Sequence, residues 1–311
     1  MLKKMLLGTA MTLAATATAG VVTSTSADAA SKVDMKEVNV QFVPSSQADK
    51  MEAKTKPLEK LLSKELGGVP VHVSVSTDYN TVVEAMGSKK VDLGFLPPDP
   101  YVHANDKYGV KPLLQSERYD INDKKGDGSS TDKLVDSYRA MVVVKDDSKI
   151  KDVKDLKGKS IAVQGTTSDA GYIFPIVDLK KDGVNVIKDS KLVTVKGHDQ
   201  GVMSVLNGDT DAAFIFNDAR NLVKKDNKDV FKKTRALTYT EEIPNDTISV
   251  RKGVSKHDQE ALKKALKTVA NDDKEGKKIM HDVYTWEGVT DTKDSNFDKV
   301  RDYQKKLEDI K

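Results

Sequence analysis

The sequence of 311 residues contains no cysteine. A chain without disulfides depends on its hydrophobic core for stability, and this one is long enough for two domains that each have a core. The absence of cysteine disfavours a closed zinc site, in which thiolates are common ligands. It also excludes attachment to a membrane through a lipid-modified N-terminal cysteine.

Motifs for nucleotide binding and hydrolysis are also missing. The sequence has no GxGxxG or GxxxxGK[ST] phosphate loop and no GxSxG nucleophile turn. Its five histidines show no HxH or HExxH spacing: they are His72, His103, His198, His257 and His281. The sequence therefore predicts no catalytic site, no metal and no cofactor, and we expect a protein that is not an enzyme.

Neither sign of charge is in excess. The chain has 51 Lys and Arg residues against 48 Asp and Glu residues, a net charge of +3. These charges are spread along the chain and not gathered in one basic stretch. Such a balance indicates a hydrated surface and not a patch that binds nucleic acid or membrane.

The first 30 residues have the composition of a targeting segment. Two lysines precede an apolar run at 5–22, and Ala-Asp-Ala at 27–29 fits the pattern of a cleavage site. This order predicts a signal peptide over 1–29, cleaved near Ala29, and export to the periplasm, the cell surface or the medium. A membrane anchor is the alternative, but the run is rich in Ala and Thr and only weakly apolar.

Apolar runs with strand and helix spacing alternate along the rest of the chain. Strands are predicted at 38–43, 71–75, 91–96, 138–144, from 161, and at 190–196, 212–216 and 247–251. Helices are predicted at 51–66 and 79–86, and the polar stretch 119–136 is expected to be a surface excursion. This alternation predicts an α/β protein built from βαβ units.

The stretch IAVQGTTSDAG, at 161–171, is where the sequence is most informative. It has the pattern of a short strand, a loop rich in hydroxyl groups and the start of a helix. Backbone N–H groups at a helix start lack partners and carry partial positive charge, so with Thr166, Thr167 and Ser168 they could hold a tetrahedral oxyanion. An ordinary turn with a Ser or Thr cap has the same pattern.

Several stretches together resemble the phosphate-, phosphite- and phosphonate-binding proteins of ABC importers. In order they are TDY at 77–79, KVDLGFLPP at 90–98, DLKGK at 155–159, TTSDAGYIFP at 166–175, GHD at 197–199 and IPND at 243–246. The resemblance implies a type II periplasmic-binding-protein fold, with two α/β lobes joined by a two-segment hinge. Lobe 1 would be 31–138 plus 252–311, and lobe 2 would be 139–251.

The resemblance also implies a ligand site between the lobes. In the family, hydroxyls and amides of the loop hold the phosphonate oxygens, and the matching positions here are Thr167, Ser168, Asp169 and Ala170, with Thr166 adjacent. His198 matches a histidine that donates to the same group, and a neighbouring dianion should favour its protonated form. Tyr79 matches a tyrosine that contacts the ligand from the first lobe. A strand-end histidine and a core-edge tyrosine are the structural alternatives.

Other positions are expected around the same ligand. Ser45 and Ser46 follow the first strand, in a turn that opens on the cleft in such folds. Leu96 and Tyr101, with Pro97, are expected to form a wall around an organic end. Asp218 and Asp246 match positions that hold the amine of an aminoalkyl phosphonate, although either could instead cap a helix or a turn.

Asp169 departs from the family pattern, which has Ser or Thr at this position. A carboxylate beside a dianion is repulsive. Asp169 therefore either points to solvent or accepts a proton from the ligand. Pro175 would kink a helix that began much earlier, which indicates a start as late as Ala170 or Gly171.

Together these features predict an exported, monomeric receptor that captures a phosphonate, phosphite or phosphate. It would deliver this ligand to the membrane permease of an ABC importer and its ATPase. A receptor for an amino acid or another small organic anion on the same fold is the alternative. Such receptors generally place an arginine at the carboxylate, and neither loop 164–171 nor loop 197–201 contains one.

Overall fold

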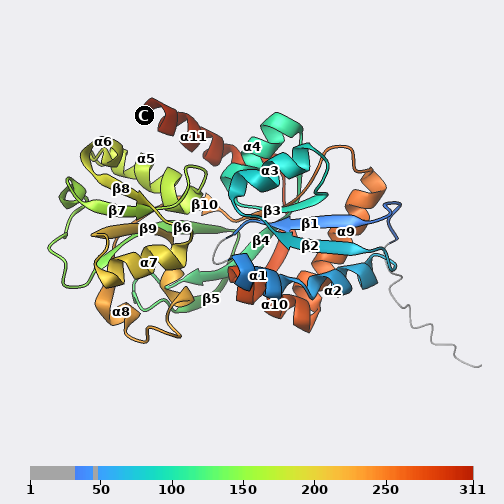
Figure 1. Ribbon diagram of the computed structural model, residues 1–311, viewed down its shortest axis with the longest axis horizontal. Coiled ribbons are helices and arrows are strands. Elements are labelled where there is room, and N and C mark those ends of the chain that lie inside the picture. The colour runs from blue at the N-terminus through green and yellow to red at the C-terminus, as the bar shows by residue number, and fades with distance from the viewer. Residues whose placement is uncertain (1–31, 45–47, 311) are drawn as a thin grey trace, which may run out of the picture.

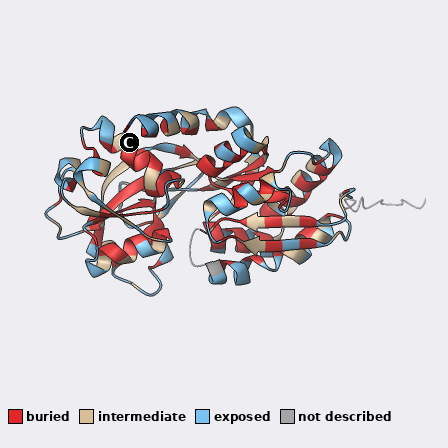
Figure 2. Ribbon diagram, turned by 45° about the horizontal axis from the view of Figure 1, so that its top comes forward, coloured by how far each residue is buried: buried red, intermediate tan, exposed pale blue. Residues whose placement is uncertain are grey.

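The computed structural model describes residues 32–44 and 48–310, whose strands form two separate sheets (Figure 1). In these residues the first sheet has the order β12-β4-β11-β3-β1-β2, with β5 paired to β4, and the second has the order β10-β6-β9-β7-β8. Helices flank each sheet, and the strands between them are largely buried (Figure 2). We call the first sheet with its helices the first lobe and the second sheet with its helices the second lobe.

The first sheet comprises β1 (Val38–Phe42), β2 (Val71–Val75), β3 (Leu93–Leu96), β4 (Lys111–Ile121), β5 (Ser130–Val135), β11 (Thr247–Val250) and β12 (Gly288–Asp291). Its helices are α1 (Ala48–Thr55), α2 (Leu58–Glu65), α3 (Tyr79–Gly87), α4 (Pro98–Tyr108), α9 (Lys256–Lys267) and α10 (Lys274–Tyr284). The second sheet comprises β6 (Ser137–Lys145), β7 (Ser160–Val163), β8 (Lys191–Thr194), β9 (Ala212–Phe216) and β10 (Thr234–Pro244). Its helices are α5 (Phe174–Lys181), α6 (Val186–Asp189), α7 (His198–Asn207) and α8 (Val230–Lys233), and α11 (Asp298–Ile310) ends the chain.

Each sheet is built around parallel strands. β1 pairs in parallel with β2 and β3, and β7 pairs in parallel with β8 and β9. Strands buried on both faces read as continuous apolar runs, and every residue of β3 is buried. The predicted α/β class is confirmed. Ligand sites in such sheets lie beyond the carboxyl ends of the strands, and both sets of parallel strands end toward the other lobe (Figure 1).

Two crossover segments, 136 and 245–246, join the lobes and lie side by side. The Asn245 amide donates to the carbonyl oxygen of Asp136 at 2.7 Å, and the Asn245 side chain donates to the carbonyl oxygens of Ser116 and Val135 at 2.9 Å. Gln115 also donates to the Asp136 carbonyl, at 2.9 Å. Asn245 is fully buried, so its side chain replaces the water that these carbonyl groups would otherwise need.

The second crossover falls earlier than the sequence prediction placed it. We expected lobe 2 to extend over 139–251, but Thr247–Val250 forms β11, which pairs with β3 and β4 of the first sheet. The C-terminal helix also departs from the expected division. α11, assigned to lobe 1, packs on α4 of the first lobe and on α5 of the second (Figure 1).

One local prediction was wrong and a second was incomplete. The helix expected at 51–66 is divided into α1 and α2, because Pro57 has no amide hydrogen and restricts the residue before it. The stretch 119–136, expected to be a surface excursion, does lie largely at the surface, but it continues β4 into a hairpin with β5. Most β5 residues are exposed, so this strand lacks the apolar alternation that would reveal it.

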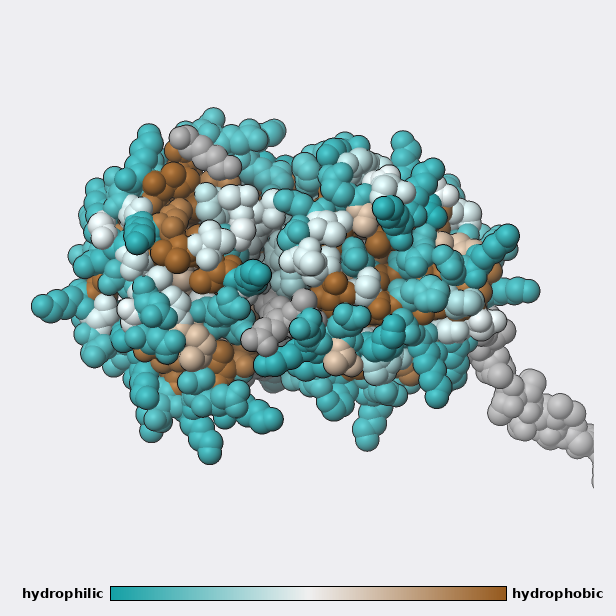
Figure 3. Space-filling view, in the orientation of Figure 1, coloured by the Kyte–Doolittle hydropathy of each residue, from teal (hydrophilic) through white to brown (hydrophobic). Residues whose placement is uncertain are grey.

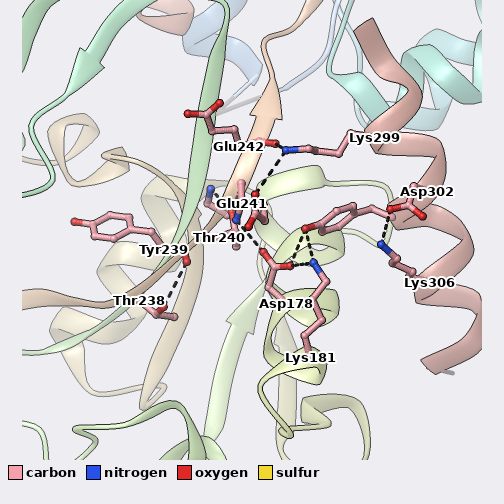
Figure 4. Close-up of polar contacts among 12 residues, drawn as sticks. Asp178, Lys181, Thr238, Tyr239, Thr240, Glu241, Glu242, Lys299, Asp302 and Lys306 are labelled. Carbon is pink, nitrogen blue, oxygen red and sulfur yellow. Dashed lines mark hydrogen bonds and ion pairs between the residues drawn. The ribbon is translucent and has the colours of Figure 1, made fainter. Parts of the chain in front are cut away.

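Polar contacts hold α11 against the second lobe (Figure 4). The Tyr303 hydroxyl donates to Asp178 of α5 at 2.8 Å and accepts from Lys181 at 2.8 Å. The Tyr303 ring stacks on Phe174, with 4.0 Å between ring centroids. Asp178 also accepts the backbone amide of Glu241 in β10 at 2.9 Å, so one carboxylate joins three elements.

The face of the molecule shown in Figure 3 is mostly hydrophilic. Among the described residues, no helix combines the length and hydropathy needed to span a membrane. The predicted signal peptide at 1–29 lies outside the described residues.

Candidate functional site

A small cavity lies between the lobes. From the first lobe it is lined by Val43, Tyr79, Pro97, Arg118, Asp246 and Tyr284, and from the second by Tyr138, Ser168, Asp169, Ala170, His198 and Phe216. The space inside that admits a water-sized molecule is about 50 Å³. Since one water needs roughly 10–15 Å³ measured in this way, the cavity has room for a ligand of only a few heavy atoms.

Three helix N-termini meet at this cavity. Tyr79 is the first residue of α3, Ala170 lies in the π-helical turn Asp169–Ile173 that precedes α5, and His198 is the first residue of α7. The predicted cap of α3 is confirmed, because the Asp78 carboxylate accepts the amide of Thr81 at 2.9 Å. Backbone N–H groups at helix starts attract anions, and three such ends on one cavity make it suited to a negative ligand.

Ser168 begins the helical turn in the second lobe. Its hydroxyl oxygen accepts the amide of Gly171 at 3.1 Å, which leaves the O–H as a donor. Gly171 is required at this point because a Cβ there would lie 2.1 Å from Cγ of Gln164. The chain tolerates Pro175 although the π-helical turn runs directly into α5, because the carbonyl oxygen of Gly171, four residues earlier, accepts the backbone amide of Gln164 at 3.0 Å.

His198 is buried, and the structure indicates its tautomer. Its Nδ1 accepts the backbone amide of Phe216 at 3.3 Å, so the proton of the neutral ring is on Nε2. Burial, assisted by the positive charge of Arg118, lowers the pKa of His198 to about 3. The expected protonated form is therefore not the one this structure favours, and His198 offers a neutral N–H donor.

Arg118 of β4 is a cavity residue that the sequence reasoning missed. Only 8% of it is exposed, and its guanidinium lies 4.8 Å from the centre of the Tyr138 ring. Its NH2 group lies 3.9 Å from the Asp246 carboxylate, beyond hydrogen-bond distance, and its Nε has no hydrogen-bond partner among the described residues. A buried guanidinium with unused donors is suited to bind an oxyanion.

Asp246 lies on the same wall, just before β11. Burial raises its pKa to about 6, against the opposing effect of the Arg118 charge. Of the two acidic residues predicted to hold an amine, it is the one that lines the cavity. Asp218 instead forms a buried ion pair with Arg220, with 2.6 Å between Oδ2 and NH2, and does not line the cavity.

Asp169 is 1% exposed, so it does not point to solvent. Its Oδ2 accepts the backbone amide of Asp99, at the start of α4 in the first lobe, at 3.0 Å. Its Oδ1 is buried and has no hydrogen-bond partner among the described residues. Burial, together with the negative charge of Asp99, raises the pKa of Asp169 well above its ordinary value.

Several predicted residues lie away from the cavity. Thr166 and Thr167 line a separate surface pocket beside α3, α4 and α11. Leu96 and Tyr101 are buried in the first lobe, and the Tyr101 hydroxyl donates to Asp294 at 2.6 Å. Ser45 and Ser46 lie outside the described residues.

The residues that sequence reasoning missed come from separate elements. They are Val43, Arg118, Tyr138, Phe216, Leu222, Val283, Tyr284 and Thr285. Tyr284 uses its hydroxyl within the first lobe, donating to the carbonyl oxygen of Val43 at 2.6 Å. None of these positions belongs to a local pattern that marks a site.

One group of potential metal ligands occurs in the described residues. Carboxylate and imidazole atoms of Asp34, His257 and Asp258 lie within 4.8 Å of one another. None of the three lines the cavity. Asp258 already accepts the amide of Asp34 at 2.7 Å, so its carboxylate serves the local fold.

Comparisons with known proteins agree with this architecture. The family of ABC transporter, phosphonate, periplasmic substrate-binding proteins matches residues 40–297. The phosphate-import protein PhnD of Mycolicibacterium smegmatis is 27% identical over 188 residues, which are 58% of this chain. The match covers 55% of that relative, so the chain spans about half the length of this curated protein.

Two solved structures share the fold. The binding protein component of an ABC phosphonate transporter from Pseudomonas aeruginosa has a TM-score of 0.72 at 17% identity, covering 87% of this chain and 86% of that one. PhnD1 from Prochlorococcus marinus, in complex with methylphosphonate, has a TM-score of 0.73 at 19% identity, covering 88% and 98%. The predicted two-lobed fold of periplasmic binding proteins is confirmed.

Proposed function

This chain belongs to the family of periplasmic substrate-binding proteins of phosphonate ABC transporters, and from that premise we propose that it captures a small phosphorus oxyanion between its lobes. The ligand is a phosphonate, phosphite or phosphate. The protein delivers it to the membrane permease of an ABC importer, which a separate ATPase drives. The family is one of solute-binding proteins and not an enzyme class.

One observation carries this proposal: the starts of α3, α7 and the turn before α5 meet Arg118 at a single cavity of about 50 Å³. Helix N-termini and a guanidinium are donors without acceptors of their own, and an oxyanion has several acceptor oxygens. The small volume favours an anion with no tail or a short one. The cavity lies between two lobes that share a two-segment hinge, so opening the hinge would admit the ligand.

The proposed contacts come from both walls. Ser168, the backbone at Ala170 and the Nε2–H of His198 donate to the oxygens from the second lobe. Tyr79 and Arg118 donate from the first lobe. Thr166 and Thr167 would reach the ligand only if the loop rearranged, because both face another pocket.

The end of the ligand away from these donors faces apolar groups and one carboxylate. Pro97 and Phe216 line the cavity and would contact a methyl group. Asp246 would hold an amine, as expected for an aminoalkyl phosphonate, but the lobes would have to separate slightly to admit the longer chain. Phosphate, phosphite and methylphosphonate fit the observed volume better.

Arg118 strengthens the alternative, a receptor for an amino acid or another organic anion. Arginine pairs with carboxylates as readily as with phosphorus oxyanions, and Asp246 beside it could hold an ammonium group. The absence of arginine from the two binding loops therefore does not exclude such a ligand, because Arg118 reaches the cavity from a strand. What supports the phosphorus ligand over a carboxylate is the family together with the three helix starts.

Export through a signal peptide at 1–29 and a monomeric state are part of this proposal. Mass spectrometry of the exported protein would test the cleavage site near Ala29. Light scattering of the protein without its first 29 residues would test the monomer.

Calorimetric titration of the same protein tests the proposed ligand. The set is phosphate, phosphite, methylphosphonate, 2-aminoethylphosphonate and the common amino acids. We expect one site per chain and tight binding of at least one phosphorus oxyanion. Tight binding of an amino acid with none for any phosphorus compound would overturn the proposal.

A further inference from the structure

Asp169 is an unusual residue to find in an anion site. Its carboxylate is almost completely buried and lines the cavity, yet only one of its two oxygens is used. Oδ2 accepts the amide of Asp99 from the opposite lobe, whereas Oδ1 has no partner among the described residues. A buried oxygen without a partner costs stability, and a hydrogen-bond donor on the ligand would complete it.

The cavity offers little positive charge to balance a second carboxylate. The charged or titratable groups on the elements around Asp169 are Tyr79 of α3, Asp99 of α4, Arg118 of β4, Tyr138 of β6, His198 of α7, Asp246 before β11 and Tyr284 of α10. Arg118 lies 3.9 Å from Asp246, so the negative charge of Asp246 offsets its positive charge. His198 is neutral, and Asp99 is a further acid that accepts Gln304 of α11 at 2.5 Å.

A doubly charged ligand beside an ionised Asp169 would therefore place three negative charges in one buried space with little compensation. One proton placed between Oδ1 and a ligand oxygen removes this repulsion and also supplies the missing hydrogen bond. Burial and the charge of Asp99 raise the pKa of Asp169, which favours this arrangement.

We propose that Asp169 and the bound phosphorus oxyanion share one proton, so that the site selects an anion able to enter with a single proton between them. This inference rests on the proposed function and specifies its ligand as a weak oxyacid. Where the free ligand is singly protonated, it brings the proton and its P–OH donates to Oδ1. Where Asp169 is protonated in the free protein and the ligand is a dianion, the proton comes from Asp169 with no net uptake. Where both groups are ionised, one proton is taken from solvent on binding, and no other bond changes.

The test is calorimetric titration of the protein without residues 1–29 with methylphosphonate and with phosphate between pH 5.5 and 8.5. Each titration is run in two buffers of different ionisation enthalpy, which counts the protons taken up. Where the pH exceeds the pKa values of both the ligand and Asp169, we expect uptake of about one proton and an affinity that falls about tenfold per pH unit.

Two variants remove the titrating group and keep a donor. Asp169→Asn preserves an acceptor for the Asp99 amide and gives the ligand an N–H, and Asp169→Ser introduces the hydroxyl that the related family has. Both should bind without proton uptake, with an affinity that no longer falls at alkaline pH. Asp246→Asn is the matched control, because it removes the other carboxylate of the cavity and should leave the uptake near one.

The outcomes separate the two proposals. If proton uptake and its pH dependence are the same in the unaltered protein and in both Asp169 variants, the shared proton is wrong and the proposed function stands. The same holds if uptake persists in both Asp169 variants, or disappears only in Asp246→Asn. If no phosphorus oxyanion binds at any pH, the proposed function fails and this inference fails with it.

Discussion

The two lobes present walls of different chemistry to the same cavity. The second lobe contributes Ser168, Ala170 and His198, which offer uncharged donors at the starts of helical segments. The first lobe contributes Arg118 and Asp246, opposite charges 3.9 Å apart. Uncharged donors accept many small anions, whereas a charged pair restricts the total charge that the site can hold. We infer that the second lobe supplies the uncharged donors to the oxygens and that the first lobe supplies the charged donor, Arg118.

Removing the cation of the first-lobe wall should produce the largest effect. In Arg118→Ala the ligand loses its charged donor, and Asp246 is left facing the anion without a counter-charge. We expect the binding free energy to weaken by about 2–5 kcal/mol, the range for truncating one partner of a buried charge pair. Calorimetric titration with the best phosphorus ligand measures this loss.

The same wall can be tested with both charges removed. In Arg118→Ala combined with Asp246→Asn the repulsive carboxylate is absent, so part of the lost affinity should return. The non-additivity of the two changes gives the coupling between the residues. An Arg118→Ala protein that binds as tightly as the original would contradict the division of roles between the lobes.

On the loop of the second-lobe wall, substitutions should weaken ligand binding less than Arg118→Ala does, and only at Ser168. Ser168→Ala removes one hydrogen bond to a charged ligand, which should cost about 1.5–3 kcal/mol of binding free energy. Thr167→Ala is the matched control on the same loop, and its affinity should stay unchanged because Thr167 lines another pocket. Equal losses in both variants would mean that the loop rearranges around the ligand.

The sequence was most informative for the site residues that belong to a local sequence pattern. The loop before α5 and the starts of α3 and α7 follow local sequence patterns, and Tyr79, Ser168 and His198 do line the cavity. Thr166 and Thr167 share the composition of that loop but turn away from the cavity, because backbone direction in a turn is not visible in composition. The sequence alone could not identify Arg118 as a cavity residue. Its position at the cavity depends on how β4 pairs with the distant strands β11 and β12.

The fold was predictable to a similar degree. Alternating apolar runs identified the βαβ order, but the lobe boundary after β10 depends on the pairing of β11 with β3 and β4. Such pairing between distant segments has no local signal. The exposed hairpin of β4 and β5 was missed for the opposite reason, because its polar sequence resembles a loop although its backbone is paired.

The titrating groups of the two walls allow a finer comparison, through the pH dependence of stability. The pKa of His198 is lowered from 6.5 to about 3, so between these values the unfolded state binds more protons and stability rises with pH. The pKa of Asp246 is raised from 3.8 to about 6, so over that interval the folded state binds more protons and stability falls with pH. From about pH 4 to 6 the two effects oppose each other.

Replacing either His198 or Asp246 should reveal the pH dependence of stability that the other group causes. His198→Gln should make the free energy of unfolding decrease with pH, relative to the original protein, by about 1.4 kcal/mol per pH unit between pH 4 and 6. Asp246→Asn should change the slope by a similar amount in the opposite direction. Urea unfolding at pH 4, 5 and 6 measures both slopes, and parallel curves for all three proteins would refute the assigned protonation states.

The smallest effect is expected in α11, which contacts both lobes and lines neither wall of the cavity. Tyr303→Phe removes the hydroxyl that bonds Asp178 and Lys181 but keeps the ring that stacks on Phe174. One such hydrogen bond contributes about 0.5–1.5 kcal/mol to the free energy of unfolding, and urea unfolding should show a loss of this size. Ligand affinity should stay within about twofold, because the two walls remain intact. A larger loss of affinity than of stability would mean that α11 takes part in positioning the lobes, and the cavity would then depend on three structural units and not on two.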